Sequence, residues 1–162
     1  MIIVSDTTPL HYLILLGRAD ILQTLFGNIV LPEAVFAEMQ HERTPELVKT
    51  WVAALPAWIE VRRPSPNFLA SVKQLGKGET QAIALALEMK AEALLADDKQ
   101  AIKEARRNNL IVVTTLGILE RAAEKNLVDF SKALSELSKT NFHLPSDNII
   151  QEVLRRAGRQ AR

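Results

Sequence analysis

The chain has 162 residues, 48% of them apolar, and 20 basic against 19 acidic side chains. This length and apolar content predict one folded globular domain and exclude a disordered chain. The absence of cysteine excludes disulfides and thiolate metal sites, and the net charge of +1 excludes a global field that attracts nucleic acid, although a local basic patch would suffice.

Five short β-type runs alternate with helical stretches along the chain. The runs are "IIVS" (2–5), "NIVL" (28–31), "WIEV" (58–61), "ALLA" (93–96) and "LIVV" (110–113). Strands that alternate with helices predict a parallel sheet covered by helices on both faces. The fold class expected from the pattern is therefore α/β.

Capping and turn signals place the helices between these runs. Thr8 and Pro9 predict the N-cap and first residue of a helix that ends at Gly17. The stretch "GETQAIALALEMK" is apolar around much of its circumference, which predicts a buried helix before the fourth strand. Three further helices are expected at about 115–125, 130–139 and 147–158. Arginines at 155, 156, 159 and 162 crowd the end of the chain, either as a solvated helix end or as a basic strip for RNA or a partner.

Acidic residues follow the ends of two strands. Asp6 directly follows the first strand in "VSDTTPL", and Asp97 and Asp98 directly follow the fourth in "LLADDK". Ligands of open parallel sheets bind outside the carboxyl ends of the strands, so these acids meet if the two strands are neighbours. Glu79, at the start of the buried helix, and Glu38, in "LPEAVFAEM", are placed to lean over the same edge.

Each acid also has a structural explanation. Asp6 would serve as a strand-end turn residue, Glu79 as a partner of a helix dipole, and one of the Asp97 and Asp98 pair as a helix N-cap. Several carboxylates at one edge, however, repel one another unless a cation lies between them. An all-oxygen cluster suits Mg²⁺ or Mn²⁺, and such ions activate water and stabilise a phosphoryl transition state. The shared placement of the acids therefore predicts hydrolysis of a phosphodiester.

These segments, taken in order over about residues 1–113, resemble the PIN domain. This is the fold of metal-dependent ribonucleases that include the VapC toxins of prokaryotic toxin–antitoxin pairs. "VSDTTPL", "LPEAVFAE", "GETQAIALALE" and "LLADDK" are similar to the four acidic segments of the family. The stretches "SDTTPL", "GE" and "TLGILERAAEKNLV" are closer to a divergent PIN-like subgroup than to typical toxins.

The resemblance implies a single PIN-like domain over residues 1–162, with a core over about 1–125 and C-terminal helices over about 126–160. It implies a five-stranded parallel sheet in the order 3-2-1-4-5. The catalytic residues would be Asp6, Glu38, Glu79 and Asp98. Asp6 and Glu79 would bind the metal together with Asp98 or Asp97, of which Asp98 fits the family's Thr-x-Asp spacing.

The implied activity is that of a Mg²⁺- or Mn²⁺-dependent endoribonuclease, in which a metal-activated water attacks the RNA phosphodiester. The implied partners are an RNA substrate, an antitoxin protein and a second copy of the chain. The segment "DTTPLHYLILLGRADILQTLF" supports the homodimer, because it carries more apolar surface than one sheet face covers. The start of the chain has no basic leader, and no apolar run approaches about 18 residues, so we expect a cytoplasmic protein without membrane contact.

Three positions depart from the family pattern and support a second hypothesis. Glu79 stands where many toxins carry Asp, Ala96 stands where Thr or Ser is usual, and Lys99 follows the fourth acid in place of an aromatic residue. The second hypothesis is a catalytically silent PIN-like module that binds RNA or a protein partner.

Overall fold

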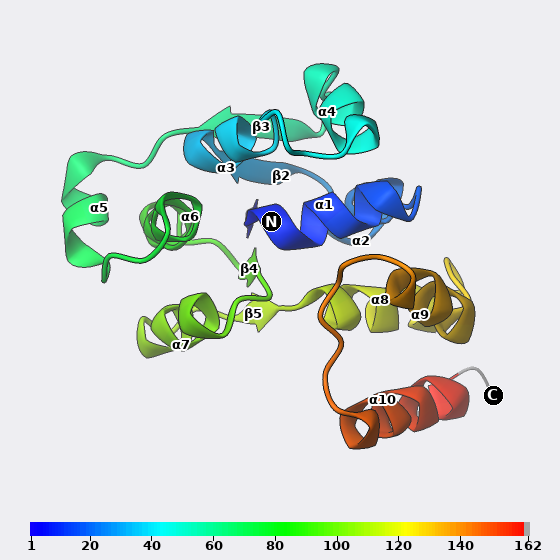
Figure 1. Cartoon of the computed structure of the whole chain (residues 1–162). Coiled ribbons are helices and arrows are strands. Elements are labelled where there is room, and N and C mark those ends of the chain that lie inside the picture. Colours follow the sequence, from blue (N-terminus) through cyan, green and yellow to red (C-terminus); the bar gives the residue numbers. More distant parts are fainter. Residues whose placement is uncertain (161–162) are drawn as a thin grey trace. The chain divides into compact units, whose positions relative to one another are not determined.

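The computed structural model describes residues 1–160, with side chains described up to Ala157. The chain divides into two compact units, Met1–Thr115 and the residues from Leu116 onward (Figure 1). The core expected from the sequence, residues 1–125, extends past this division. In the part of the chain that the structure describes, no helix is long and apolar enough to cross a membrane.

The N-terminal unit is built on a five-stranded parallel sheet in the order β3-β2-β1-β4-β5. The strands are β1 (Ile3–Ser5), β2 (Ile29–Pro32), β3 (Ile59–Arg62), β4 (Ala93–Leu95) and β5 (Val112–Val113). Ile3 of β1 pairs with Ile29 on one side and Ala93 on the other, so β1 is the central strand and all its residues are buried. The predicted fold class and strand order are confirmed.

Helices lie on both sides of this sheet. They are α1 (Thr7–Leu15), α2 (Asp20–Phe26), α3 (Glu33–Glu38), α4 (Glu46–Ala53), α5 (Pro66–Ser71), α6 (Lys77–Glu88) and α7 (Lys99–Arg107). In Figure 1, α5, α6 and α7 lie on one side of the sheet, and α1 and α2 lie on the other. Most of α6 is buried, with contacts to β1, β2 and β4, which confirms the predicted buried helix.

The first helix begins earlier than the sequence predicts. Asp6, not Thr8, is the N-cap of α1, and its side chain accepts a hydrogen bond of 2.8 Å from the backbone N–H of Thr7. Pro9 lies in the first turn, where its missing N–H costs nothing because these donors have no partner within the helix. A carboxylate is also as good an N-cap as a hydroxyl, so the Thr-Pro signal was outcompeted by the acid two residues before it.

The apolar segment that suggested a second copy packs within the chain. Leu10, Leu13 and Ile14 of α1 are buried, as are Ile21 and Leu22 of α2. The exposed large apolar residues of the described chain are Met1, Leu47, Val61, Ile111 and Ile149, and none belongs to this segment. The homodimer therefore stays a prediction that rests on the family resemblance alone.

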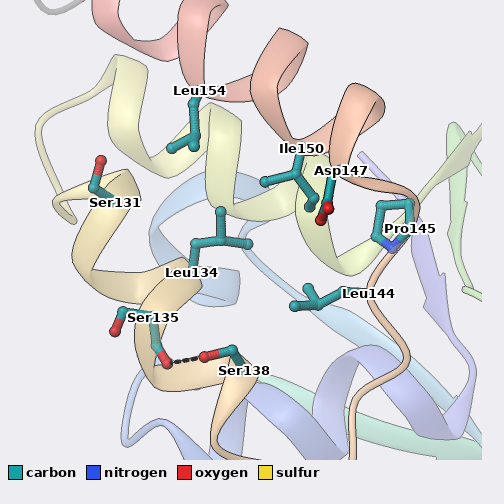
Figure 2. Close-up of a pocket in the computed structure, with 9 residues that line it drawn as sticks. All are labelled: Ser131, Leu134, Ser135, Ser138, Leu144, Pro145, Asp147, Ile150 and Leu154. Carbon is teal, nitrogen blue, oxygen red and sulfur yellow. Dashed lines mark hydrogen bonds between the residues drawn. The ribbon is translucent and has the colours of Figure 1, made fainter.

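The C-terminal unit is helical. It contains most of α8 (Thr115–Glu124), with α9 (Phe130–Ser138) and α10 (Asp147–Gln160), close to the three helices expected from the sequence. A hollow of about 330 Å³ lies between α9 and the segment that leads into α10. Figure 2 shows its apolar wall, formed by Leu134, Leu144, Ile150 and Leu154, and the Ser138 hydroxyl that donates to the carbonyl of Ser135.

The arginines near the end of the chain are partly neutralised. Arg155 pairs with Glu152, and Arg156 pairs with Glu120 at 3.1 Å. The side chain of Arg159 and all of Arg162 lie outside the described residues. The two arginines in the described part of α10 therefore form ion pairs, as expected of a solvated helix surface.

One hydrogen bond fixes α3 to α6 beside the carboxyl edge of the sheet. The N-cap of α3 is Pro32, which has no side-chain acceptor for the first N–H groups of the helix. The Oε1 atom of Gln81, on α6, accepts from the buried N–H of Ala34 at 2.9 Å and supplies the missing cap. This bond holds α3 against the start of α6.

Removing this acceptor is expected to destabilise the fold. Gln81→Met keeps the length of the side chain but leaves the N–H of Ala34 without its partner, so the free energy of unfolding should fall by about 1 kcal/mol. Gln81→Glu, which keeps an acceptor oxygen, is the control. Urea unfolding of the three proteins measures the difference, and equal stability of Gln81→Met and the wild type would contradict the capping role.

Candidate active site

The fold gathers acids from four helices at the carboxyl edge of the sheet. Strands of a parallel sheet end at this edge, and the crossover helices, which run back against the strands, begin there. Asp6 follows β1 and caps α1, Asp98 caps α7 after β4, and Glu79 lies in the first turn of α6. Glu38 is the last residue of α3, the short helix that follows β2.

Asp6 is the buried member of this group, with 5% of its surface exposed. Its backbone N–H donates to the carbonyl of Leu95 at 2.8 Å, which joins the end of β1 to the end of β4. The pKa of Asp6 is raised to about 7, chiefly by burial, although the hydrogen bond from Thr7 opposes the rise. The negative charges of Glu79, Glu38 and Asp98 contribute to the same rise, so these three carboxylates lie within electrostatic reach of Asp6.

Glu79 has both a capping role and a place in the acidic group. It is the third residue of α6 after the N-cap Gly76, and its carboxylate accepts from the backbone N–H of Gly76, as in a capping box. Burial and the charges of Asp98 and Glu38 nevertheless raise its pKa. Glu79 therefore serves as a partner of the helix N-terminus, and it also lies beside the other acids.

Glu38 reaches the group from the C-terminal end of α3. Its Oε2 accepts a hydrogen bond of 2.7 Å from the hydroxyl of Thr7, the first residue of α1. Its carboxylate also lies against Gly78, in the first turn of α6. Glu38 is exposed, as is Asp98, so the site has a buried acid at its base and exposed acids at its rim.

The structure separates Asp98 from its neighbour Asp97. Asp98 caps α7 by accepting from the N–H of Ala101 at 2.9 Å, and its charge acts on both Asp6 and Glu79. Asp97 turns to Thr115, whose backbone N–H donates to it at 3.0 Å and whose hydroxyl donates to its other oxygen. Burial raises the pKa of Asp97, and none of the four grouped acids contributes to that shift. The geometry thus includes Asp98 in the group and leaves Asp97 beside it.

The donor set fits a hard divalent cation in its chemistry. All four side chains offer carboxylate oxygens, the ligands that Mg²⁺ and Mn²⁺ prefer. The pKa of Asp6 is raised by burial and, to a smaller extent, by negative charges that a cation would offset. Among the described residues, no three acids or histidines converge closely enough to hold a metal ion as they stand. Hydrogen bonds from residues at helix starts hold the carboxylates: Thr7 donates to Asp6 and Glu38, Gly76 to Glu79, and Ala101 to Asp98. Asp6, Glu38 and Asp98 each use one of their two oxygens in this way.

Comparison with known families identifies the fold. The model of the PIN domain family DUF3368 matches residues 2–159. The chain belongs to the PIN domain family. PIN domains are generally nucleases and generally use divalent metals, which agrees with the class of chemistry that the acids predict.

Solved structures are also similar to this PIN domain. A PilT N-terminus domain protein from the hyperthermophilic archaeon Sulfolobus solfataricus aligns with 90% of this chain and 100% of its own, at 16% identity and a TM-score of 0.47. No protein of curated function is similar enough in sequence to match.

Sequence reasoning missed the two threonines that contact the acids. The sequence pattern assigns no contact to Thr7 and places Thr115 at the start of a helix, whereas the hydroxyls of these threonines donate to Glu38 and Asp97. Thr7 lies 31 residues from Glu38 and Thr115 lies 18 from Asp97, so no local spacing signals either contact. The available signal was the strand order, which places the residues after β1, β4 and β5 at one edge.

The raised pKa of Asp6 predicts how stability depends on pH in the metal-free protein. The folded state keeps the proton of Asp6 up to about pH 7, whereas the unfolded state loses it near pH 3.8, so stability falls as pH rises through this window. Asp6→Asn keeps an acceptor for Thr7 but has no charge, and should be more stable than the wild type by roughly 2–4 kcal/mol at pH 8. The gain should shrink toward pH 4. Thermal melts in EDTA across this range measure it, and a variant less stable at every pH would show that Asp6 is only a cap.

Asp97 and Asp98 are expected to differ in what they support. Asp97→Ala removes the acceptor of Thr115, a fully buried residue, and should lower the free energy of unfolding by about 1–3 kcal/mol. Asp97→Asn, which keeps an acceptor oxygen, should be milder. Neither change should reduce the Mn²⁺-induced rise in melting temperature, whereas Asp98→Asn should. A loss of the Mn²⁺ effect in Asp97→Asn would instead place Asp97 among the ligands.

Proposed function

We propose that this PIN domain is a Mg²⁺- or Mn²⁺-dependent endoribonuclease. The observation that carries the proposal is the group formed by Asp6, Glu38, Glu79 and Asp98, in which at least five of the six pairs interact electrostatically. Four carboxylates within electrostatic reach of one another are costly for a fold without a cation, and burial of Asp6 increases the cost. Membership in a family of nucleases makes phosphodiester hydrolysis the reaction that such a group would serve.

The residues of the chain would divide the work as follows. Asp6, Glu79 and Asp98 would hold the ion directly, and Glu38, at the rim of the site, would help to hold it by orienting water and would accept a proton. A divalent ion bound there supplies positive charge that lowers the pKa of water and offsets charge on the phosphate. Asp6, with its pKa near 7 in the metal-free protein, would give up its proton when the ion binds, so metal binding should strengthen as pH rises through neutrality.

The resemblance to VapC toxins extends the proposal to a cellular setting. In that setting, the chain is the toxin of a toxin–antitoxin pair, RNA is the substrate, and an antitoxin protein holds the activity in check. A cytoplasmic location follows from the same setting.

A silent RNA- or protein-binding module is the second candidate. The observation that favours it is the capping of the acids: Asp6, Glu79 and Asp98 each already accept a backbone N–H at a helix start. In such a module the acids would serve the helices alone, and metal would have no effect on stability.

Two aspartates with the same local role separate these candidates. Asp98 and Asp129 are both N-caps that accept a backbone N–H three residues on, in α7 and α9. Replacing either by Asn should have a similar, small effect on stability. Only Asp98→Asn should lower the Mn²⁺-induced rise in melting temperature and reduce Mn²⁺-dependent cleavage of RNA, by at least about a hundredfold.

The assay uses the full chain with bulk RNA, with Mn²⁺ or with EDTA. Internal cleavage that requires Mn²⁺, persists in Asp129→Asn and is lost in Asp98→Asn supports the nuclease. If Mn²⁺ does not change the melting temperature of the wild type and the RNA stays intact, the silent module is the better account.

A further inference from the structure

The first turn of α6 is shaped around the carboxylate of Glu38. Gly78 is buried, and a methyl group added to it would lie 2.7 Å from Oε1, 3.1 Å from Cδ and 3.2 Å from Oε2 of Glu38. These are the three nearest atoms, so the space that a side chain would take is filled by this one carboxylate. Its backbone does not need glycine, because the positive φ angles among glycines of the described chain occur at Gly17 and Gly27.

Thr7 holds the same carboxylate from the side of α1. Its hydroxyl donates to Oε2 of Glu38 at 2.7 Å, whereas the atom nearest to the Gly78 position is Oε1. The carboxylate of Glu38 therefore lies between the first turn of α1 and the first turn of α6. These are also the turns next to Asp6 and Glu79, whose pKa values the charge of Glu38 helps to raise.

We infer that Gly78 is a positioning residue of the metal site: its missing side chain lets Glu38 lie beside Asp6 and Glu79, and Thr7 fixes it there. The inference rests on the proposed metal-dependent function. The inference explains why the residue before Glu79 is glycine. Neither helix formation nor the backbone conformation at this position requires one.

Glycine at this position has a cost in the helix. Within a helix, alanine is more favourable than glycine because it loses less backbone entropy on folding. The obstacle to alanine is the far end of a flexible side chain, which can swing away from α6. Gly78→Ala should therefore fold as well as the wild type or better, with Glu38 displaced. Displacement also separates Glu38 from Asp6, which reduces repulsion in the metal-free protein.

The predicted signature is a pair of opposite effects. Gly78→Ala should melt at a temperature no lower than the wild type in EDTA, while its dissociation constant for Mn²⁺ rises about tenfold, the usual effect of disturbing a group that supports the metal ligands. Titration calorimetry with Mn²⁺ alone measures the constant. A residue with a purely structural role would change stability and leave the Mn²⁺ constant of the folded protein unaltered.

Glu38→Ala provides the matched background. With the carboxylate removed, Gly78→Ala has nothing to displace, so the double variant should bind Mn²⁺ as Glu38→Ala does. Thr7→Val, which removes the hydroxyl and keeps the shape, tests the other support without touching α6 and should also weaken Mn²⁺ binding. If Gly78→Ala fails to fold but folds in the Glu38→Ala background, the stability of the two proteins shows the conflict with the Glu38 carboxylate instead. Failure to fold in both backgrounds overturns the role of Gly78.

The outcomes distinguish this inference from the function on which it rests. If the wild type binds Mn²⁺ and both Gly78→Ala and Thr7→Val bind it equally well, the positioning role is overturned. The nuclease proposal then still stands. Equal weakening by Gly78→Ala in the wild-type and Glu38→Ala backgrounds also overturns it, because the effect then does not pass through Glu38. A wild type that binds no Mn²⁺ overturns the proposed function and the positioning role together.

Discussion

Repulsion among carboxylates at one sheet edge is the constraint on which the rest of this site depends. Parallel strands end where the crossover helices begin, so the topology that collects Asp6, Glu79 and Asp98 also collects the positive ends of α1, α6 and α7. Each of these acids accepts a backbone N–H at a helix start. The compensation is incomplete at Asp6, because burial and three neighbouring charges outweigh one hydrogen bond and raise its pKa to about 7.

A second buried acid shows what complete compensation looks like. Glu104 on α7 has 4% of its surface exposed, close to the 5% of Asp6, although less protein surrounds its carboxylate than surrounds that of Asp6. It accepts from the guanidinium of Arg107 and from the backbone N–H of Lys73, and these partners lower its pKa, whereas the pKa of Asp6 is raised. The fold can therefore supply a buried carboxylate with a cation of its own. At Asp6 it supplies three more carboxylates, the arrangement expected of the proposed metal site, which would take its cation from solution.

The sequence predicts the sheet well and the side-chain contacts poorly. Strand positions follow from short apolar runs, and their order follows from a family resemblance, so the edge at which the acids gather could be foreseen. The N-cap of α1 was misplaced because two adjacent cap signals, Asp6 and Thr8, compete, and local pattern alone does not rank them. Other contacts join residues from separate elements: Glu38 contacts Thr7 and Gly78, and Asp97 contacts Thr115. Sequence does not predict them, because they depend on how far each helix projects over the edge of the sheet.

Capping and metal binding are compatible roles for these acids. In the "GKGE" segment, Gly76 donates its N–H to Glu79, and Gly78 leaves space for Glu38, so one helix start supports two carboxylates without a cation. A cation would compete with these hydrogen bonds for the carboxylate oxygens. Because the helix ends carry only partial positive charge, a divalent ion offsets the repulsion more strongly than they do. The helix ends thus keep the acids together in the metal-free protein, at a free-energy cost that binding of the ion would recover.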